Sequence, residues 1–152
     1  MTETTTAIGT LIEAWRAALH ARDADALAAC CTPDLRVGGM APPLWIEGVA
    51  AQDAAMRAWF ATWDGPIGTT LRDLRIEAEG KVGFASAHAR MQGARTDGTR
   101  TDLWYRWTAG FRRAAPADRG HDGWRIAHAH SSVPFRMDGS YRAETGLSPP
   151  AR

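Results

Sequence analysis

Two histidines stand two residues apart near the end of the chain, in residues 124–135, which read WRIAHAHSSVPF. A strand that only fills a core usually carries Val, Ile or Leu at its buried positions. Imidazole both donates and accepts protons near neutral pH, so the pair indicates binding or acid–base chemistry. In an extended strand alternate side chains share a face. The residues expected on this face are Trp124, Ile126, His128, His130 and Ser132.

Three interpretations of the His-x-His pair stay open. Both imidazoles can be half-buried sheet residues that hydrogen-bond to neighbours or water. They can also bind a ligand or transfer protons at a pocket wall, with His128 or His130 as the acid–base group. The third alternative is a metal site that adds His88. The chain has no HExxH motif and no cysteine-pair pattern, so the leading interpretation assigns no metal.

Neighbouring strands are expected at residues 70–78, 82–92 and 101–112. In the second of them Phe84, His88 and Arg90 alternate with alanines, and in the third Asp102, Trp104, Arg106 and Thr108 alternate with Leu103, Tyr105 and Trp107. If the polar positions turn inward, they line a pocket, and each buried guanidinium then needs an acid or an anionic ligand. Arginine suits a carboxylate because it binds at two points. Asp102 is one candidate partner and a third candidate catalytic residue, with His128 and His130. The candidate ligand-binding residues are Trp15, Trp59, His88, Arg90, Trp104, Arg106, Thr108 and Ser132.

Helical spacing of apolar residues from Ile8 to Leu19 predicts a first helix over residues 6–21, with Trp15 on its apolar side. Asp23 is placed as the N-cap of a second, short helix. Short strands are expected at 35–37 and 44–46, and a third helix from Gly48 until Gly65-Pro66. The preferred interpretation of Trp59 in that helix is packing against the sheet, and the alternative is a place in the wall of a pocket. The pattern predicts an α+β domain with a four-stranded antiparallel meander.

The composition predicts a single domain over residues 1–152, with its core at about 6–136 and a weakly ordered tail at 137–152. A net charge of +1 argues against a nucleic-acid patch or a polybasic membrane surface. Cys30 and Cys31 are adjacent and are expected to be reduced core residues. No signal segment or membrane span is visible, so we expect a soluble, cytoplasmic protein.

Several blocks of the sequence have the order found in one known family. They are the Arg22-Asp23 turn, PDL, AWFATWDGPIG, DLRI, the strand with His88 and Arg90, LWYRWT, FRR and WRIAHAHSSVPF. Over residues 8–135 the chain resembles the SnoaL-like branch of the nuclear transport factor 2-like superfamily, with a cystatin-like α+β fold. The resemblance implies a cone: a curved antiparallel sheet wrapped around N-terminal helices and enclosing a pocket, commonly in a homodimer. The family includes polyketide cyclases, ketosteroid isomerases and many small bacterial proteins.

The superfamily also includes the association domain of calcium/calmodulin-dependent kinase, in which pocket arginines hold a small carboxylate. By that likeness Arg90 falls on a pocket arginine, which favours an inward direction for the polar positions. The steroid isomerase chemistry does not carry over. That mechanism uses a first-helix tyrosine and two pocket acids, whereas this chain has Trp15 and Gly39 at two of those positions. Close relatives often have Glu between the histidines, and this chain has Ala129.

The resemblance therefore predicts a small-molecule-binding protein for an anionic, aromatic or polyketide-like ligand. As an enzyme it would be a cofactor-free acid–base cyclase, isomerase or hydrolase-like protein. The alternatives are a non-catalytic association or ligand-sensing domain and the His-rich metal site. The expected partners are the ligand and a second copy of the chain, without nucleic acid, membrane or cofactor.

Overall fold

The computed structural model describes residues 1–151. Helix α1 (Glu3–Ala21) begins at Thr2, whose hydroxyl accepts a hydrogen bond from the Thr5 N–H. Its apolar side chains recur every three or four residues, so one stripe of the helix can be buried while the rest meets solvent. The predicted helix is confirmed, and its buried residues are Ile8, Leu11, Ile12, Ala18 and Leu19.

Two shorter helices complete the helical layer. In α2 (Ala24–Ala29) the Asp23 carboxylate accepts a hydrogen bond from the Ala26 N–H at 3.0 Å, as the N-cap prediction requires. Helix α3 (Val49–Phe60) begins after Gly48, as predicted, but ends before Trp63, which instead forms a single bridge with Arg95. Within residues 1–151 no helix is both long and apolar enough to cross a membrane.

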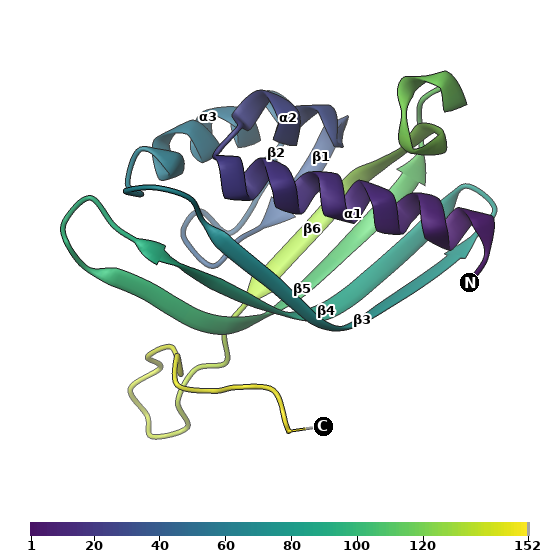
Figure 1. Ribbon diagram of the computed structural model, residues 1–152. Helices are drawn as coiled ribbons and strands as arrows, with labels where there is room; N and C mark the ends of the chain where they lie inside the picture. Colours follow the sequence, from purple (N-terminus) through teal and green to yellow (C-terminus); the bar gives the residue numbers. More distant parts are fainter. Residues whose placement is uncertain (152) are drawn as a thin grey trace.

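The strands form one curved, unclosed sheet in the order β2-β1-β6-β5-β4-β3 (Figure 1). The expected meander β3–β6 is present, but the sheet is mixed because β1 runs parallel to β6. The predicted strand at 44–46 is wrong in position, since Leu44 is 89 % exposed in a loop. The strands are β1 (Cys31–Gly38), β2 (Ile46–Glu47), β3 (Gly68–Glu79), β4 (Val82–Ala94), β5 (Arg100–Arg113) and β6 (Trp124–Ser132), with short 3-10 turns at Ala117–Arg119 and His121–Gly123 before β6.

The three helices lie on one side of the sheet, here called the inner face, and the opposite side is the outer face (Figure 1). The small and apolar positions of β4 and β5 point inward: Ala85, Ala89, Trp107 and Phe111 are all buried with Ile8. The hypothesis that the polar positions turn inward is therefore wrong. Burying two large rings and the alanines beneath α1 removes more apolar area from water than the polar set would.

An irregularity in β6 changes which side chains share a face. Ile126 pairs with Phe111, but the next paired residue is His128, opposite Gly110, so one residue is left unpaired in between. Such a bulge reverses the alternation of side chains along the strand. Trp124 and Ile126 are consequently buried on the inner face, whereas His128, His130 and Ser132 lie on the outer face. The prediction that these five residues share one face is therefore correct only for His128, His130 and Ser132.

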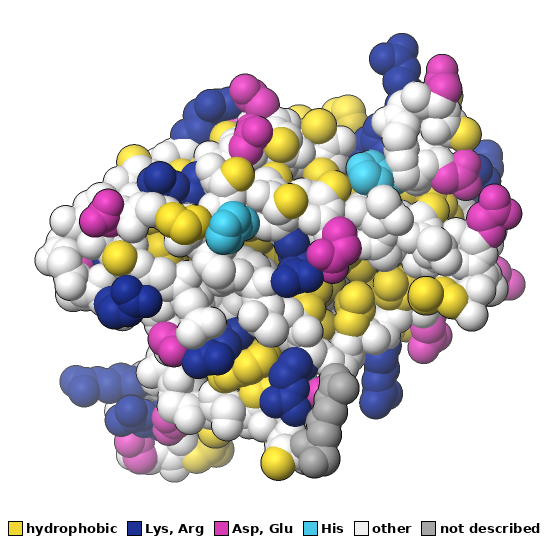
Figure 2. Space-filling view, in the orientation of Figure 1, with side chains coloured by type: hydrophobic (Ala, Val, Ile, Leu, Met, Phe, Trp, Pro, Cys, Tyr) yellow, Lys and Arg dark blue, Asp and Glu magenta, His cyan; other side chains and the backbone are white. Residues whose placement is uncertain are grey.

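The chain after β6 folds on the outer side of the sheet, away from α1 (Figure 1). Phe135 and Ala143 form a bridge, and the rings of Phe135 and Tyr141 meet edge to face with centroids 5.4 Å apart. The Arg72 guanidinium donates a hydrogen bond to the Pro150 carbonyl at 2.8 Å, which ties the end of the tail to β3. On the side that α1 covers, basic and acidic side chains are interspersed (Figure 2), as the near-balanced composition predicts.

Candidate functional site

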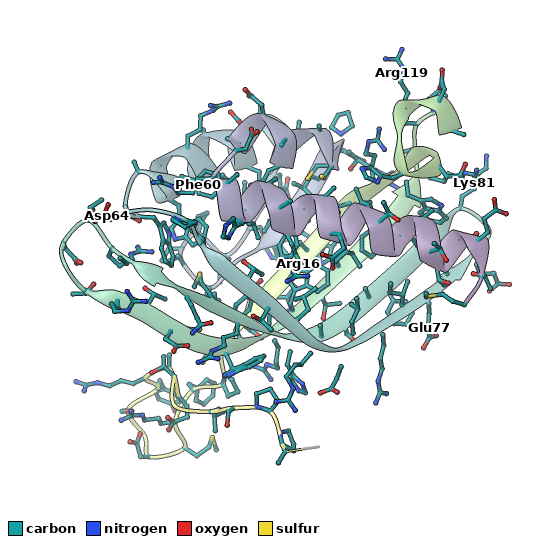
Figure 3. All side chains as sticks on the ribbon, viewed as in Figure 1. Arg16, Phe60, Asp64, Glu77, Lys81 and Arg119 are labelled. Carbon is teal, nitrogen blue, oxygen red and sulfur yellow. The ribbon has the colours of Figure 1, made fainter. Side chains whose placement is uncertain are left out.

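The outer face brings together nine of the eleven predicted site residues. Arg106 on β5 pairs with His88 on β4 and with Ser132 on β6. Thr108 pairs with His130, and Trp104 with Arg90. Glu77 on β3 points to this side of the sheet, away from α1 (Figure 3). The full set on this face is His88, Arg90, Asp102, Trp104, Arg106, Thr108, His128, His130 and Ser132, whereas Trp15 and Trp59 lie among the helices.

Asp102 is the acid that binds Arg90. The sequence offered two alternative partners, an acid such as Asp102 or an anionic ligand, and the structure has the acid. The Arg90 Nε and Nη2 atoms donate to the two carboxylate oxygens of Asp102 at 2.8 and 3.0 Å. The amide of Gln92 donates a third bond at 3.2 Å. These donors, Arg90 first, lower the pKa of Asp102 below its usual value. A carboxylate held ionised in this way is a weak base, so its geometry favours a structural role over a catalytic one.

The histidines of the outer face do not converge on one metal. The Nδ1 atom of His88 lies 3.1 Å from a carboxylate oxygen of Asp73. His88 is on β4, and β5 separates it from His128 and His130 by two strand spacings, roughly 10 Å. Within residues 1–151, no three His, Cys, Asp or Glu side chains are close enough together to hold a metal ion. The geometry therefore gives the metal alternative no support.

A hollow of about 490 Å³ lies beside His130, at the edge of the sheet formed by β1 and β2. Its walls are Gly38 and the loop of residues 39–45, which includes Trp45. The Trp45 ring lies 5.8 Å from the His128 ring, and the Arg36 guanidinium is 4.1 Å from the indole centroid. Sequence analysis missed Arg36 and Trp45. The signal for Trp45 was its two-residue spacing from Glu47, which places both side chains on one face of an extended strand. Arg36 joins them through the β1–β2 pairing, in which it lies opposite Glu47.

Trp15 and Trp59 lie among the helices, near large apolar side chains that are only half-buried. One buried cluster sits under the first half of α1, and a second, which includes Phe60 and Trp63, sits under its C-terminal end. Trp15 and Met91 pack against both clusters and yet stay half-buried. Trp15 also stacks on Trp107, with centroids 5.0 Å apart and an interplanar angle of 25°.

Trp59 extends this group of rings on α3. Its ring centroid lies 5.3 Å from that of Trp63, in an edge-to-face contact, and 5.6 Å from that of Phe60, whose ring is tilted. Met56, on the same helix, is also half-buried against the second cluster. The group of Trp15, Met56, Trp59 and Met91 is called the aromatic–methionine group below. The sequence identified both tryptophans but not Met91, whose inward position depends on the direction of β4.

Two ionisable side chains packed in the core region have strongly raised pKa values. Burial raises the pKa of the Tyr105 hydroxyl to about 12. Burial, and then the neighbouring Cys30, raises the pKa of the Cys31 thiol to about 12. Cys30 and Cys31 are both free thiols, as expected. A group that stays protonated at neutral pH does not act as a general base there, so neither residue supplies one.

The architecture and the sequence together match one family model. The SnoaL-like domain model matches residues 8–136. The chain belongs to the SnoaL-like family. The resemblance seen in the sequence is thereby confirmed, and so is the α+β fold. No curated protein matches the chain.

Solved structures of SnoaL-like and related proteins share this fold. A nuclear transport factor 2-like protein of unknown function from Pseudomonas putida is 26 % identical, with a TM-score of 0.83 over 98 % of this chain and 99 % of that chain. A candidate aromatic ring hydroxylase from Novosphingobium aromaticivorans is 20 % identical (TM-score 0.74, 86 % and 88 % covered). A ketosteroid isomerase-like protein from Erwinia carotovora atroseptica is 18 % identical (TM-score 0.72, 87 % and 97 % covered).

Proposed function

We propose that this SnoaL-like protein binds a small, flat, mainly apolar molecule between the helices and the inner face of the sheet. The observation that carries the proposal is the half-burial of the aromatic–methionine group, in which Trp15 and Met91 pack against both buried clusters and Met56 and Trp59 against the second. A ring that covers these side chains removes apolar area from water, which is worth about 25 cal/mol per Å². Indole rings are rigid, so they lose little conformational freedom on binding. A polyketide-like aromatic compound has the required shape.

Two structural relatives have names that refer to ring-containing compounds. One is named for aromatic ring hydroxylation and the other for likeness to ketosteroid isomerases. These names describe those proteins, and their low sequence identities show only that they share the fold of this chain. The membership of the SnoaL-like family supports small-molecule binding in general.

The inner-face ligand is proposed to be bound rather than transformed by acid–base chemistry. Tyr105 and Cys31 both have a pKa of about 12, so they are protonated at neutral pH. The role that fits these groups is ligand binding or sensing.

A second candidate function is acid–base catalysis on an anionic substrate at the outer face. The observation in its favour is that His128, His130 and Arg106 share that face. In this proposal an imidazole transfers the proton while Arg106 binds the anion. Turnover that is lost in His130→Ala and kept in Trp15→Ala would support it, and the reverse pattern would exclude it.

The inner-face proposal is tested by a thermal-shift screen against aromatic polyketides, small carboxylates and phosphates. A ligand that binds the native state raises the melting temperature, and the stabilisation grows with the logarithm of the ligand concentration divided by its Kd. We expect a flat aromatic compound to stabilise the protein and Trp15→Ala to weaken its binding by at least about tenfold. Trp104→Ala, which removes an outer-face indole, is the matched control and should leave the affinity unchanged. Equal affinity of both variants would contradict the inner-face site.

We also propose that the chain forms a homodimer through the β3–β4 hairpin end of its outer face, at the opposite edge of the sheet from β1 and β2. Phe84 lies on that face and is 49 % exposed, and Val82, two residues before it on β4, is also exposed. Family likeness supports the same expectation. A stable interface buries about 800 Å² on each partner, and large apolar side chains at its centre contribute most of the affinity.

Sedimentation equilibrium tests the dimer. The native protein should sediment with twice the mass of one chain, and Phe84→Asp should shift it to the monomer because a charge would be buried in the interface. Ala17→Asp, on the exposed side of α1, is the control and should stay dimeric. A native protein that is monomeric at micromolar concentration would reject the proposal.

A further inference from the structure

The hollow beside His130 has the size and the walls of a small-ligand site. Its volume of about 490 Å³ lies within the range of about 300–1,000 Å³ that is usual for such sites. The loop of residues 39–45 reads GMAPPLW and supplies mostly apolar walls. His130 is the one ionisable side chain among the described lining residues. The hollow therefore combines apolar walls with a single group able to orient a ligand.

Trp45 is a preformed wall of this hollow. Its ring is held between the Arg36 guanidinium, 4.1 Å from the indole centroid, and the His128 ring at 5.8 Å. Gly38 lies directly under the indole, because a Cβ atom at this position would come within 3.0 Å of its Cζ3 atom. The ring is nevertheless 41 % exposed. A fixed but exposed indole offers stacking area without a large entropic cost on binding.

The polar groups around the hollow include hydrogen-bond donors for an anion. Arg36 pairs with His128 across the β1–β6 ladder, and Gly38 pairs with His130. Glu47, 3.2 Å from Arg36, is the acid facing this group from β2. The facing positions of β5, Thr108 and Gly110, carry no charge, and neither does the loop of residues 39–45. The Arg36 guanidinium and the ring N–H groups of the two histidines can therefore donate to an anion.

We propose that this hollow binds a small aromatic carboxylate. The aromatic ring would lie against Trp45 and the prolines of the loop, and the carboxylate would accept a hydrogen bond from His130 in the field of Arg36 and His128. A charge-assisted hydrogen bond of this kind is stronger than a neutral one. The site is separate from the inner-face ligand and requires no turnover.

The test is a titration of the native protein with benzoate and, separately, with benzamide, which has the same ring but no negative charge. Binding is followed by the NMR resonances of the indole N–H groups, and Trp45→Phe identifies the Trp45 resonance as the one that disappears. We expect that resonance to shift saturably with benzoate, and benzamide to bind at least about fivefold more weakly. A flat benzoate titration, or equal affinity for the two compounds, would overturn the proposal.

Variants locate the carboxylate. His130→Ala should weaken benzoate binding by about tenfold or more, and Arg36→Gln should weaken it by less, since its charge acts at longer range. His20→Ala is the matched control, because His20 lies on α1, where its Nδ1 atom is 3.3 Å from the Ile67 carbonyl oxygen. An unchanged affinity in both His130→Ala and Arg36→Gln would refute the site. A shift confined to the Trp15 resonance would also refute it, while leaving the proposed inner-face function in place.

Discussion

The arginines of the outer face have different interaction partners, although residue type alone does not distinguish them. Arg90 is engaged at two points by Asp102, so its charge is already matched. Arg36 lies over Trp45 and beside Glu47, and Arg72 reaches the tail carbonyl of Pro150. Residue type predicts that a guanidinium seeks an anion or a carbonyl. The choice among partners depends on strand register, which the sequence does not specify.

The thiol of Cys31 gives a pH dependence that can be measured. Its folded pKa of about 12 lies above the unfolded value near 8.5, because burial penalises the thiolate. The unfolded state therefore loses this proton first as the pH rises. The resulting stabilisation is complete below about pH 8.5 and is lost progressively towards pH 12. We expect the free energy of unfolding, measured with urea, to fall over that range.

Cys31→Ala is the control for this prediction. It should flatten the alkaline decline, apart from the smaller contribution of Cys30, whose pKa burial also raises. In the native protein at about pH 8 the Cys31 thiol should react with iodoacetamide about a thousandfold more slowly than a free thiol. Rapid alkylation of the native protein would contradict the raised pKa.

At the scale of elements, periodicity predicted the helices and most strands, but not the direction of the side chains. Aromatic residues occur on both faces of β5, since Trp104 alternates with Tyr105 and Trp107. A usable signal was present in β4, where alanines at 85, 87 and 89 leave room for a helix to approach the sheet closely. The bulge in β6 was beyond prediction, because the sequence carries no glycine or proline at that point.

The bulge itself predicts the outcome of a deletion. Removing Ala127, the unpaired residue, should give a regular strand in which Ile126 still faces inward and His128 still faces outward. Every side chain keeps its face, so the loss should stay below about 1 kcal/mol. Deletion of Ala129, which is paired with Ala109, should instead cost more than about 3 kcal/mol, because the residues on one side of the deletion must then change face. Urea denaturation measures both losses, and an equal cost for the two deletions would show that the bulge does not set the register.

At the scale of the whole molecule, one domain with a separate tail is the organisation that the sequence predicts. The two buried clusters meet at Trp15 and Met91, so helices and sheet should unfold together. The chain after Pro134 contributes little to either cluster. Its hydrogen bonds are mainly internal, such as those from the Arg136 and Glu144 amides to the Arg142 and Pro134 carbonyls, both at 2.7 Å.

Truncation after Pro134 is therefore expected to change the free energy of unfolding by less than about 1 kcal/mol. In hydrogen exchange of the full chain, amides of residues 137–151 should exchange faster than those of β4 and β5, because few buried contacts hold the tail. Arg72→Gln, which removes the link to Pro150, should accelerate exchange in the last residues and leave the sheet unchanged. A loss above about 3 kcal/mol on truncation would instead make the tail part of the folding unit. The outer face would then be built by the tail as well as by the sheet.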